Sequence, residues 1–128
     1  MPITYTIDPD QKLIIGVWTG EIRAADLAES WKRLLGDHEA MAIRRNIADV
    51  RQAEILFNGW EMNNIIRSIV RPMLAGRDWK TAIVAEKPLQ IAMSRQYQVF
   101  ADTYSEDAIF RSIEDARSWL CASDSMKA

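Results

Sequence analysis

The segment WKTAIVAE, residues 79–86, decides the fold of this chain. Its centre is an unbroken run of small and β-branched residues without polar alternation, which is typical of a strand buried on both faces. Such strands occupy the middle of parallel sheets, where helices cover the sheet. We therefore predict a central strand here, joined to its neighbours by helical connections.

The segments on either side of this strand carry helical patterns. After it, Pro88 fits the first turn of a helix, where a missing N–H costs nothing. Before it, Asn58 and Glu61 have the spacing of a capping box and predict a helix that starts near Asn58. The later helix holds the 3.6-residue period with apolar residues at Leu89, Ala92, Met93, Phe100, Ala101 and Tyr104.

The helix that precedes the central strand contains a proline. Pro72 lies inside its pattern, so this helix is expected to kink or end near Arg71, with Gly76 closing the segment. The strand before this helix is predicted at about residues 43–48, ending at Asp49, with a loop over residues 50–57. The buried stripe of the helix is predicted to consist of Met62, Ile65, Ile66, Ile69 and Met73.

The N-terminal segment predicts a β-hairpin. ITYTID (residues 3–8) and KLIIGVWTG (residues 12–20) are β-rich runs separated by a Pro-Asp turn sequence. The period then changes, and a helix is predicted from Ala24, with Gly36 as a left-handed C-terminal cap. His38 is expected in an exposed connector after this helix.

The end of the chain, AIFRSIEDARSWL (residues 108–120), predicts a short strand and a short helix with Ser112 at its start and with Trp119 and Leu120 buried. The resulting order is β-β-α-β-α-β-α-β-α. It predicts an α/β fold in which an N-terminal β-hairpin is followed by a β-α-β-α-β-α superhelix, with a mixed, mostly parallel sheet covered by helices. One domain is expected over residues 1–128, with residues 121–128 as a frayed tail.

Composition and charge exclude several functions. The 16 Lys and Arg residues against 18 Asp and Glu give a net charge of -2, which provides no field for nucleic acid or an anionic membrane. No apolar run approaches the roughly 20 residues that span a bilayer, and the N-terminus lacks a signal-peptide pattern. A cytoplasmic protein without an integral membrane segment is therefore expected.

The sequence offers few residues for catalysis or metal binding. It contains one histidine, His38, and one cysteine, Cys121, which is too little for a nucleophilic triad or a zinc site. Asp8 and Asp10 form a D-x-D pair, but their position between two strands favours a turn over a Mg²⁺ site. No glycine-rich phosphate loop is present. We expect no enzyme activity and no cofactor.

Strand-to-helix loops at one end of an α/β sheet are where such folds place ligands and switches. The predicted loop after the second parallel strand offers polar groups near a helix start. These can hold an anion or a partner's carboxylate, although an ordinary solvated loop has the same composition. The predicted partner-binding residues are Asp49, Arg51, Gln52, Glu54, Asn58 and Trp60.

Four motifs stand in a recognisable order: GEIRAADL (residues 20–27), the strand ending at Asp49, AIVA (residues 82–85) and EDARSWL (residues 114–120). Together with the opening hairpin they resemble SpoIIAA-like proteins, which share the fold of STAS domains (sulfate transporter and anti-sigma factor antagonist). In anti-sigma factor antagonists of this fold, a serine in the loop after the corresponding strand is phosphorylated by a partner kinase. Residues 50–57 contain no Ser, Thr or Tyr, so this switch is not expected here.

The resemblance implies two functions. The first is a non-catalytic regulatory module that acts through contact with a protein partner, with a homodimer left open. The second follows from the similarity of the SpoIIAA-like group to the lipid-binding CRAL-TRIO proteins, which implies a carrier or sensor of a small apolar ligand. Methionines on adjacent helices suit an adaptable apolar site, although such stripes also form ordinary cores. The residues proposed for that site are Met62, Ile66, Met73 and Met93.

Overall fold

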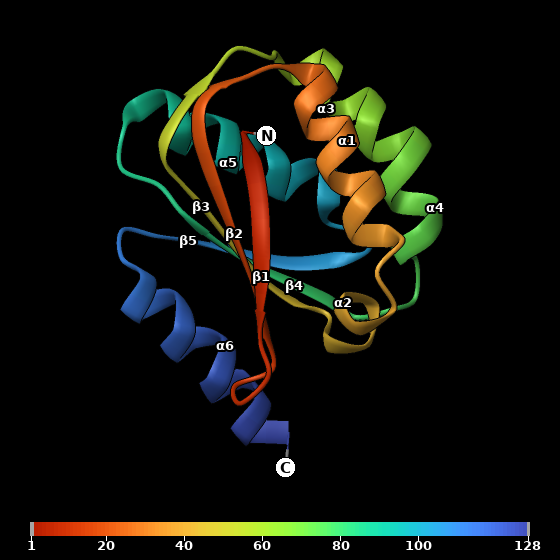
Figure 1. Ribbon diagram of the computed structural model, residues 1–128, viewed down its shortest axis with the longest axis vertical. Helices are drawn as coiled ribbons and strands as arrows, with labels where there is room; N and C mark the ends of the chain where they lie inside the picture. Colours follow the sequence, from red (N-terminus) through yellow and green to blue (C-terminus); the bar gives the residue numbers. More distant parts are fainter. Residues whose placement is uncertain (1, 128) are drawn as a thin grey trace.

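The computed structural model describes residues 2–127, with side chains for residues 2–122. A five-stranded sheet runs through the molecule in the order β1-β2-β3-β4-β5 (Figure 1). β1 pairs with β2 antiparallel, and all the other neighbours pair parallel, which confirms the predicted α/β fold class. The strands are β1 (Ile3–Asp8), β2 (Leu13–Ile22), β3 (Arg45–Ile55), β4 (Trp79–Val84) and β5 (Ser105–Phe110).

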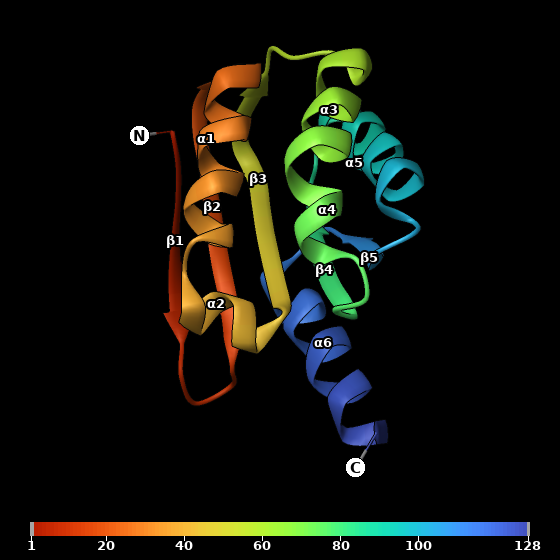
Figure 2. The same ribbon diagram turned by 90° about the vertical axis from the view of Figure 1, so that its right-hand side faces the viewer.

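The helices divide unequally between the two faces of the sheet. Because strand order equals chain order, right-handed crossovers place every connecting helix on the same face. Figures 1 and 2 show the connecting helices gathered there, with the last helix apart from them on the other side. The helical segments are α1 (Ala24–Leu35), α2 (His38–Ile43), α3 (Gly59–Ile65), the π-helical turn η1 (Ile66–Val70), α4 (Arg71–Leu74), α5 (Pro88–Ala101) and α6 (Ile113–Lys127).

The strand predicted as central, β4, lies next to the edge strand β5 and has the predicted burial. All six residues of β4 are buried. Ile83 belongs to the large core under α1, α3 and α5, whereas Ala82 and Val84 belong to the smaller core under α6. Alternation along a strand supplies both cores, so the whole strand reads as apolar.

β3 is longer than predicted. Asp49 does not end it, because the strand continues to Ile55 and residues 52–55 pair with residues 19–22 of β2. The predicted loop is therefore mostly strand. Its polar residues are the solvent-facing positions of an alternating strand whose Val50, Ala53 and Ile55 are buried. The register of the pairing between β2 and β3 shifts between Val17 and Thr19, next to the part of β3 that extends beyond Asp49.

The helix before β4, which contains Pro72, was predicted to kink or end near Arg71, and it does not end there. The helix continues through Leu74, three residues beyond Arg71. The turn before the proline is widened, and the Arg71 N–H bonds to the carbonyl of Ile66, five residues back. A π turn of this kind relieves the clash between a proline ring and the preceding turn. Gly76, with φ +77°, closes the segment as predicted.

The connection after α1 holds a helix that was not predicted. Gly36 has φ -86°, so it is not a left-handed cap, and α2 follows at once. The signal was Asp37, whose carboxylate accepts from the N–H groups of Glu39 and Ala40 as an N-cap. His38 is exposed, as expected, but it lies in the first turn of α2.

The last two helices follow the prediction in part. Pro88 is the first residue of α5, but Leu89 is 61% exposed and Gln90 is buried in its place. In α6, Ser112 accepts from the Asp115 N–H at 3.2 Å, which confirms the predicted start. Leu120 is fully buried. Trp119 is only half-buried and packs against Phe110 in a tilted arrangement, with ring centroids 5.6 Å apart.

Candidate functional site

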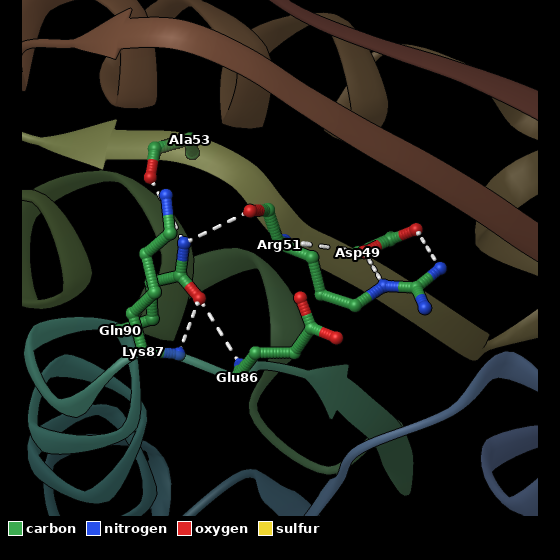
Figure 3. Close-up of polar contacts among 6 residues, drawn as sticks. All are labelled: Asp49, Arg51, Ala53, Glu86, Lys87 and Gln90. Atoms are coloured by element: carbon green, nitrogen blue, oxygen red, sulfur yellow. Dashed lines mark hydrogen bonds and ion pairs between the residues drawn. The ribbon is translucent and has the colours of Figure 1, made fainter.

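Asp49 and Arg51 form a closed ion pair on β3. They lie two residues apart and thus on the same face of the strand. Arg51 Nε donates to Asp49 Oδ1 and Nη2 to Oδ2, both at 2.9 Å (Figure 3). This hydrogen bonding raises the pKa of the Arg51 guanidinium. A partner's carboxylate would therefore have to compete with Asp49 for a guanidinium that is already engaged in a two-bond geometry.

Gln90 completes the edge of β3 where β4 ends. The β3–β4 pairing stops at Asp49, so on the β4 side the carbonyls of Arg51 and Ala53 have no neighbouring strand. Gln90 Nε2 donates to both, at 3.2 Å and 3.0 Å (Figure 3). Its Oε1 accepts from the N–H groups of Glu86 and Lys87, at 3.1 Å and 3.0 Å. One carboxamide thus ties the start of α5 to the end of β3.

The remaining predicted partner-binding residues are distributed around this end of β3. Gln52 and Glu54 are exposed, and neither side chain bonds to any residue that the structure describes. Asn58 acts as the N-cap of α3, because its Oδ1 accepts from the Glu61 N–H at 2.8 Å. The Glu61 carboxylate in turn accepts from the Asn58 N–H. Trp60, in the first turn of α3, is 74% exposed. An exposed tryptophan of this kind is the most partner-like feature of the group.

A cavity of about 70 Å³ lies between the sheet and the helices. Met62, Ile66 and Met93 line it, which brings together three of the four residues proposed for an apolar site. The walls come from β1 to β4 and from α1, α3, η1 and α5. The complete lining is Ile3, Tyr5, Ile14, Gly16, Trp18, Leu27, Ser30, Trp31, Leu34, Asn46, Ala48, Val50, Met62, Ile66, Thr81, Ile83, Met93 and Tyr97.

Met73 is not among them and is 45% exposed. The π turn explains the error. A wide turn carries one residue more than an α turn, so residues after it are rotated around the helix axis relative to a regular period. Leu74, fully buried, takes the inward position that periodicity assigns to Met73. The sequence signal for this shift is Pro72, one turn later.

The lining of the cavity carries no Asp, Glu, Lys, Arg or His side chain. Its two phenols are neutral at physiological pH. Burial raises the pKa of Tyr97 well above its usual value, and burial together with the bond to Asp37 raises the pKa of Tyr5 to about 12. The cavity is therefore an uncharged space with a mostly apolar wall.

The other candidates are engaged locally. The Asp8 carboxylate accepts from the N–H groups of Asp10 and Gln11 and pairs with Arg117 at 3.3 Å, which is turn and docking chemistry. Cys121 is half-buried in α6. Within the described part of the chain, no three His, Cys, Asp or Glu side chains are grouped to hold a metal ion. None of the helices formed by the described residues has the length and apolarity to cross a membrane.

Comparison with known proteins identifies the fold. Neither a protein-family model nor a curated protein matches the chain. Among solved structures, the chain is similar to an uncharacterised protein of the DUF3478 family with a SpoIIAA-like fold from Shewanella loihica PV-4. The TM-score is 0.62 and the identity 21%, over 93% of this chain and 94% of that chain. The protein thus has a SpoIIAA-like fold, as its motifs predicted. At this identity the likeness shows the fold alone.

Proposed function

We propose that the protein is a non-catalytic module that binds a small apolar ligand between the sheet and helices α1, α3 and α5. The observation that carries the proposal is the partly open, uncharged cavity whose lining includes Met62, Ile66 and Met93. Protein contact, the first function implied by the resemblance, named Arg51 as one of six partner-binding residues. The pairing of Arg51 with Asp49 weakens the case for that residue.

The size of the cavity limits the ligand. At about 70 Å³ it is well below the roughly 300–1,000 Å³ of typical ligand pockets. A molecule of a few non-hydrogen atoms fits this volume, whereas a long acyl chain is too large to lie within it. Methionine side chains adapt to different shapes, which suits a site of this kind. Separation of the helices from the sheet would break the bonds from Arg33 of α1 to the Ile3 carbonyl, at 2.7 Å, and from Tyr5 to Asp37, at 2.6 Å.

Methyl NMR of methionine-labelled protein tests the proposal. The probes are xenon and 2-chlorobutane, both apolar and small. The methyl signals of Met62 and Met93 are expected to shift saturably, because both side chains line the cavity, while the Met73 signal stays unchanged. Met93→Phe should reduce probe affinity by filling the space, and Met73→Phe, the same change outside the cavity, should not.

Both variants must be folded for this comparison, since overpacking a core costs about 1 to 3 kcal/mol. Circular dichroism and the dispersion of the remaining methyl signals check this. Uniform shifts of all the methionine signals, or none up to the solubility limit of the probes, would contradict ligand binding in the cavity.

Protein contact remains a second candidate because of one observation. Trp60 is 74% exposed at the start of α3, beyond the end of a strand whose Gln52 and Glu54 face solvent. Tryptophan is enriched among the residues that dominate protein interfaces. Protein contact does not exclude ligand binding, because Trp60 does not line the cavity.

A further inference from the structure

Asn46 is a polar residue in the floor of the cavity. It lies on β3 between Ile14 of β2 and Thr81 of β4, its partners in the parallel register. It is only 9% exposed and lines the cavity together with both neighbours. Strand alternation explains its direction, because Ala48 and Val50, two and four residues later, line the same cavity. An apolar residue would fit this position equally well by pattern.

Three other polar groups of the lining have partners, whereas the Trp31 indole N–H and the Ser30 hydroxyl bond to no residue that the structure describes. Tyr5 donates to the Asp37 carboxylate at 2.6 Å. Thr81 Oγ1 accepts from Trp79 Nε1 at 3.1 Å, and the Tyr97 hydroxyl accepts from Tyr104 at 3.3 Å. The Asn46 carboxamide, by contrast, bonds to none of the residues between 2 and 127. A buried amide without partners is unfavourable unless something else supplies them.

We propose that Asn46 is the polar anchor of the ligand, and that the ligand is a small neutral amphiphile with one hydroxyl, carbonyl or amide group. This rests on the proposed function, since it assumes that the cavity takes a ligand. The carboxamide both donates and accepts, so a hydroxyl or an amide can pair with it in both senses. The apolar part of the molecule then contacts Met62, Ile66 and Met93.

The head group must be uncharged. A carboxylate or phosphate enclosed here would meet no cation, because the lining holds none. Enclosing an ion without a counter-charge is far more costly than enclosing a hydrogen-bonded neutral group. The site therefore selects alcohols, ketones or amides over ionised fatty acids. Water is the competing occupant, since an ordered molecule can also satisfy a buried amide.

Three probes with matched carbon frames distinguish these outcomes. They are 2-butanol, 2-chlorobutane and 2-methylbutanoate at neutral pH, and the readout is again the methionine methyl signals. Asn46→Leu keeps the side-chain size and removes the polar group. It should weaken 2-butanol binding about three- to tenfold, the value of one hydrogen bond, and change 2-chlorobutane affinity less than about twofold. 2-Methylbutanoate should not bind.

A second measurement needs no variant. In the wild-type protein, the side-chain N–H₂ signals of Asn46 should shift with 2-butanol and stay in place with 2-chlorobutane. This keeps the proposal testable if Asn46→Leu does not fold.

Each other outcome has a distinct meaning. One such outcome is that Asn46→Leu changes the affinities for 2-butanol and 2-chlorobutane equally, and that the amide signals show no selective shift. This would show that only water satisfies Asn46. It would refute the role of Asn46 as the anchor but not ligand binding in the cavity. Binding of 2-methylbutanoate as tightly as 2-butanol would overturn the neutral head group. Failure of every probe to reach the wild-type cavity would refute the proposed function itself.

Discussion

The polar side chains at the two ends of β3 differ in whether their hydrogen-bonding groups have partners within the protein. Near its carboxyl end, Asp49 and Arg51 neutralise each other, and Gln90 satisfies two strand carbonyls and two N–H groups at once. Near its start, Asn46 is buried against an apolar cavity with no such partner among the described residues. The first arrangement stabilises the fold, and the second leaves hydrogen-bonding capacity for another molecule. Exposure and polarity alone would have suggested that the carboxyl end binds the other molecule, since that end is more exposed to solvent and more charged.

The comparison predicts its largest effect at Gln90. Gln90→Leu keeps the volume but leaves four backbone groups without partners, each of which costs about 1 to 3 kcal/mol when buried. Because water can reach part of this end, we expect a loss of about 3 to 5 kcal/mol in the free energy of unfolding, measured by urea denaturation. Gln96→Leu, an exposed position on the same helix, is the matched control and should change stability by less than about 0.5 kcal/mol. A loss below about 1 kcal/mol for Gln90→Leu would mean that β3 does not need the carboxamide.

Asp107 is half-buried, and it tests whether a polar group with few partners is costly in this sheet. It lies on β5 in register with Thr81, and burial raises its pKa to about 7 in spite of a 2.7 Å bond donated by Ser105, which lowers it. The folded protein therefore holds a proton on Asp107 more tightly than the unfolded chain does. The contribution of this proton to the free energy of unfolding is fully present below about pH 4 and is lost as the pH rises through 7.

Asp107→Asn should remove this dependence. The variant is expected to match the wild type near pH 4 and to exceed its stability at pH 8 by about 2 to 4 kcal/mol, from about 1.4 kcal/mol per pKa unit reduced for contact with water. Urea unfolding at several pH values between 4 and 8 measures the difference. Parallel pH profiles for the two proteins would show that Asp107 ionises freely, and the expected cost of burying Asn46 would then be in doubt as well.

Much of the fold could be predicted because the signals were local. The apolar run of β4, the capping box at Asn58 and the serine at the start of α6 each determine their own element through short-range physics. The error at β3 arose where a tertiary contact overrides such a signal. β3 continues past Asp49 because β2 extends beside it, and polar residues on a half-exposed strand resemble a loop.

The site was less predictable for a related reason. Gln90 and Asn46 are single polar residues in apolar segments. The backbone groups that Gln90 bonds and the strands that flank Asn46 belong to other elements. Nothing in the local sequence distinguishes a satisfied amide from an unsatisfied one. Met73 was misplaced by one residue of helical phase, which only the π turn reveals. Met62, Ile66 and Met93 were predictable as inward residues, because periodicity alone assigns their face.

The smallest effect on stability is expected at Trp60, where the second candidate function is tested. Because its side chain is 74% exposed, Trp60→Ala should change the free energy of unfolding by less than about 0.5 kcal/mol. The informative measurement is acrylamide quenching of fluorescence. Trp31 and Trp79 are buried and Trp18 and Trp119 are half-buried, so Trp60 is the most exposed of the five tryptophans, and the substitution should remove the most readily quenched part of the emission. If a second copy covers this residue, quenching in the wild type should fall as protein concentration rises, and Trp60→Ala should abolish both that change and the matching shift in sedimentation. Quenching that is independent of concentration would exclude self-association through Trp60. Contact with a different protein would then be the remaining form of the second function, and the cavity with its buried amide would be the better-supported site.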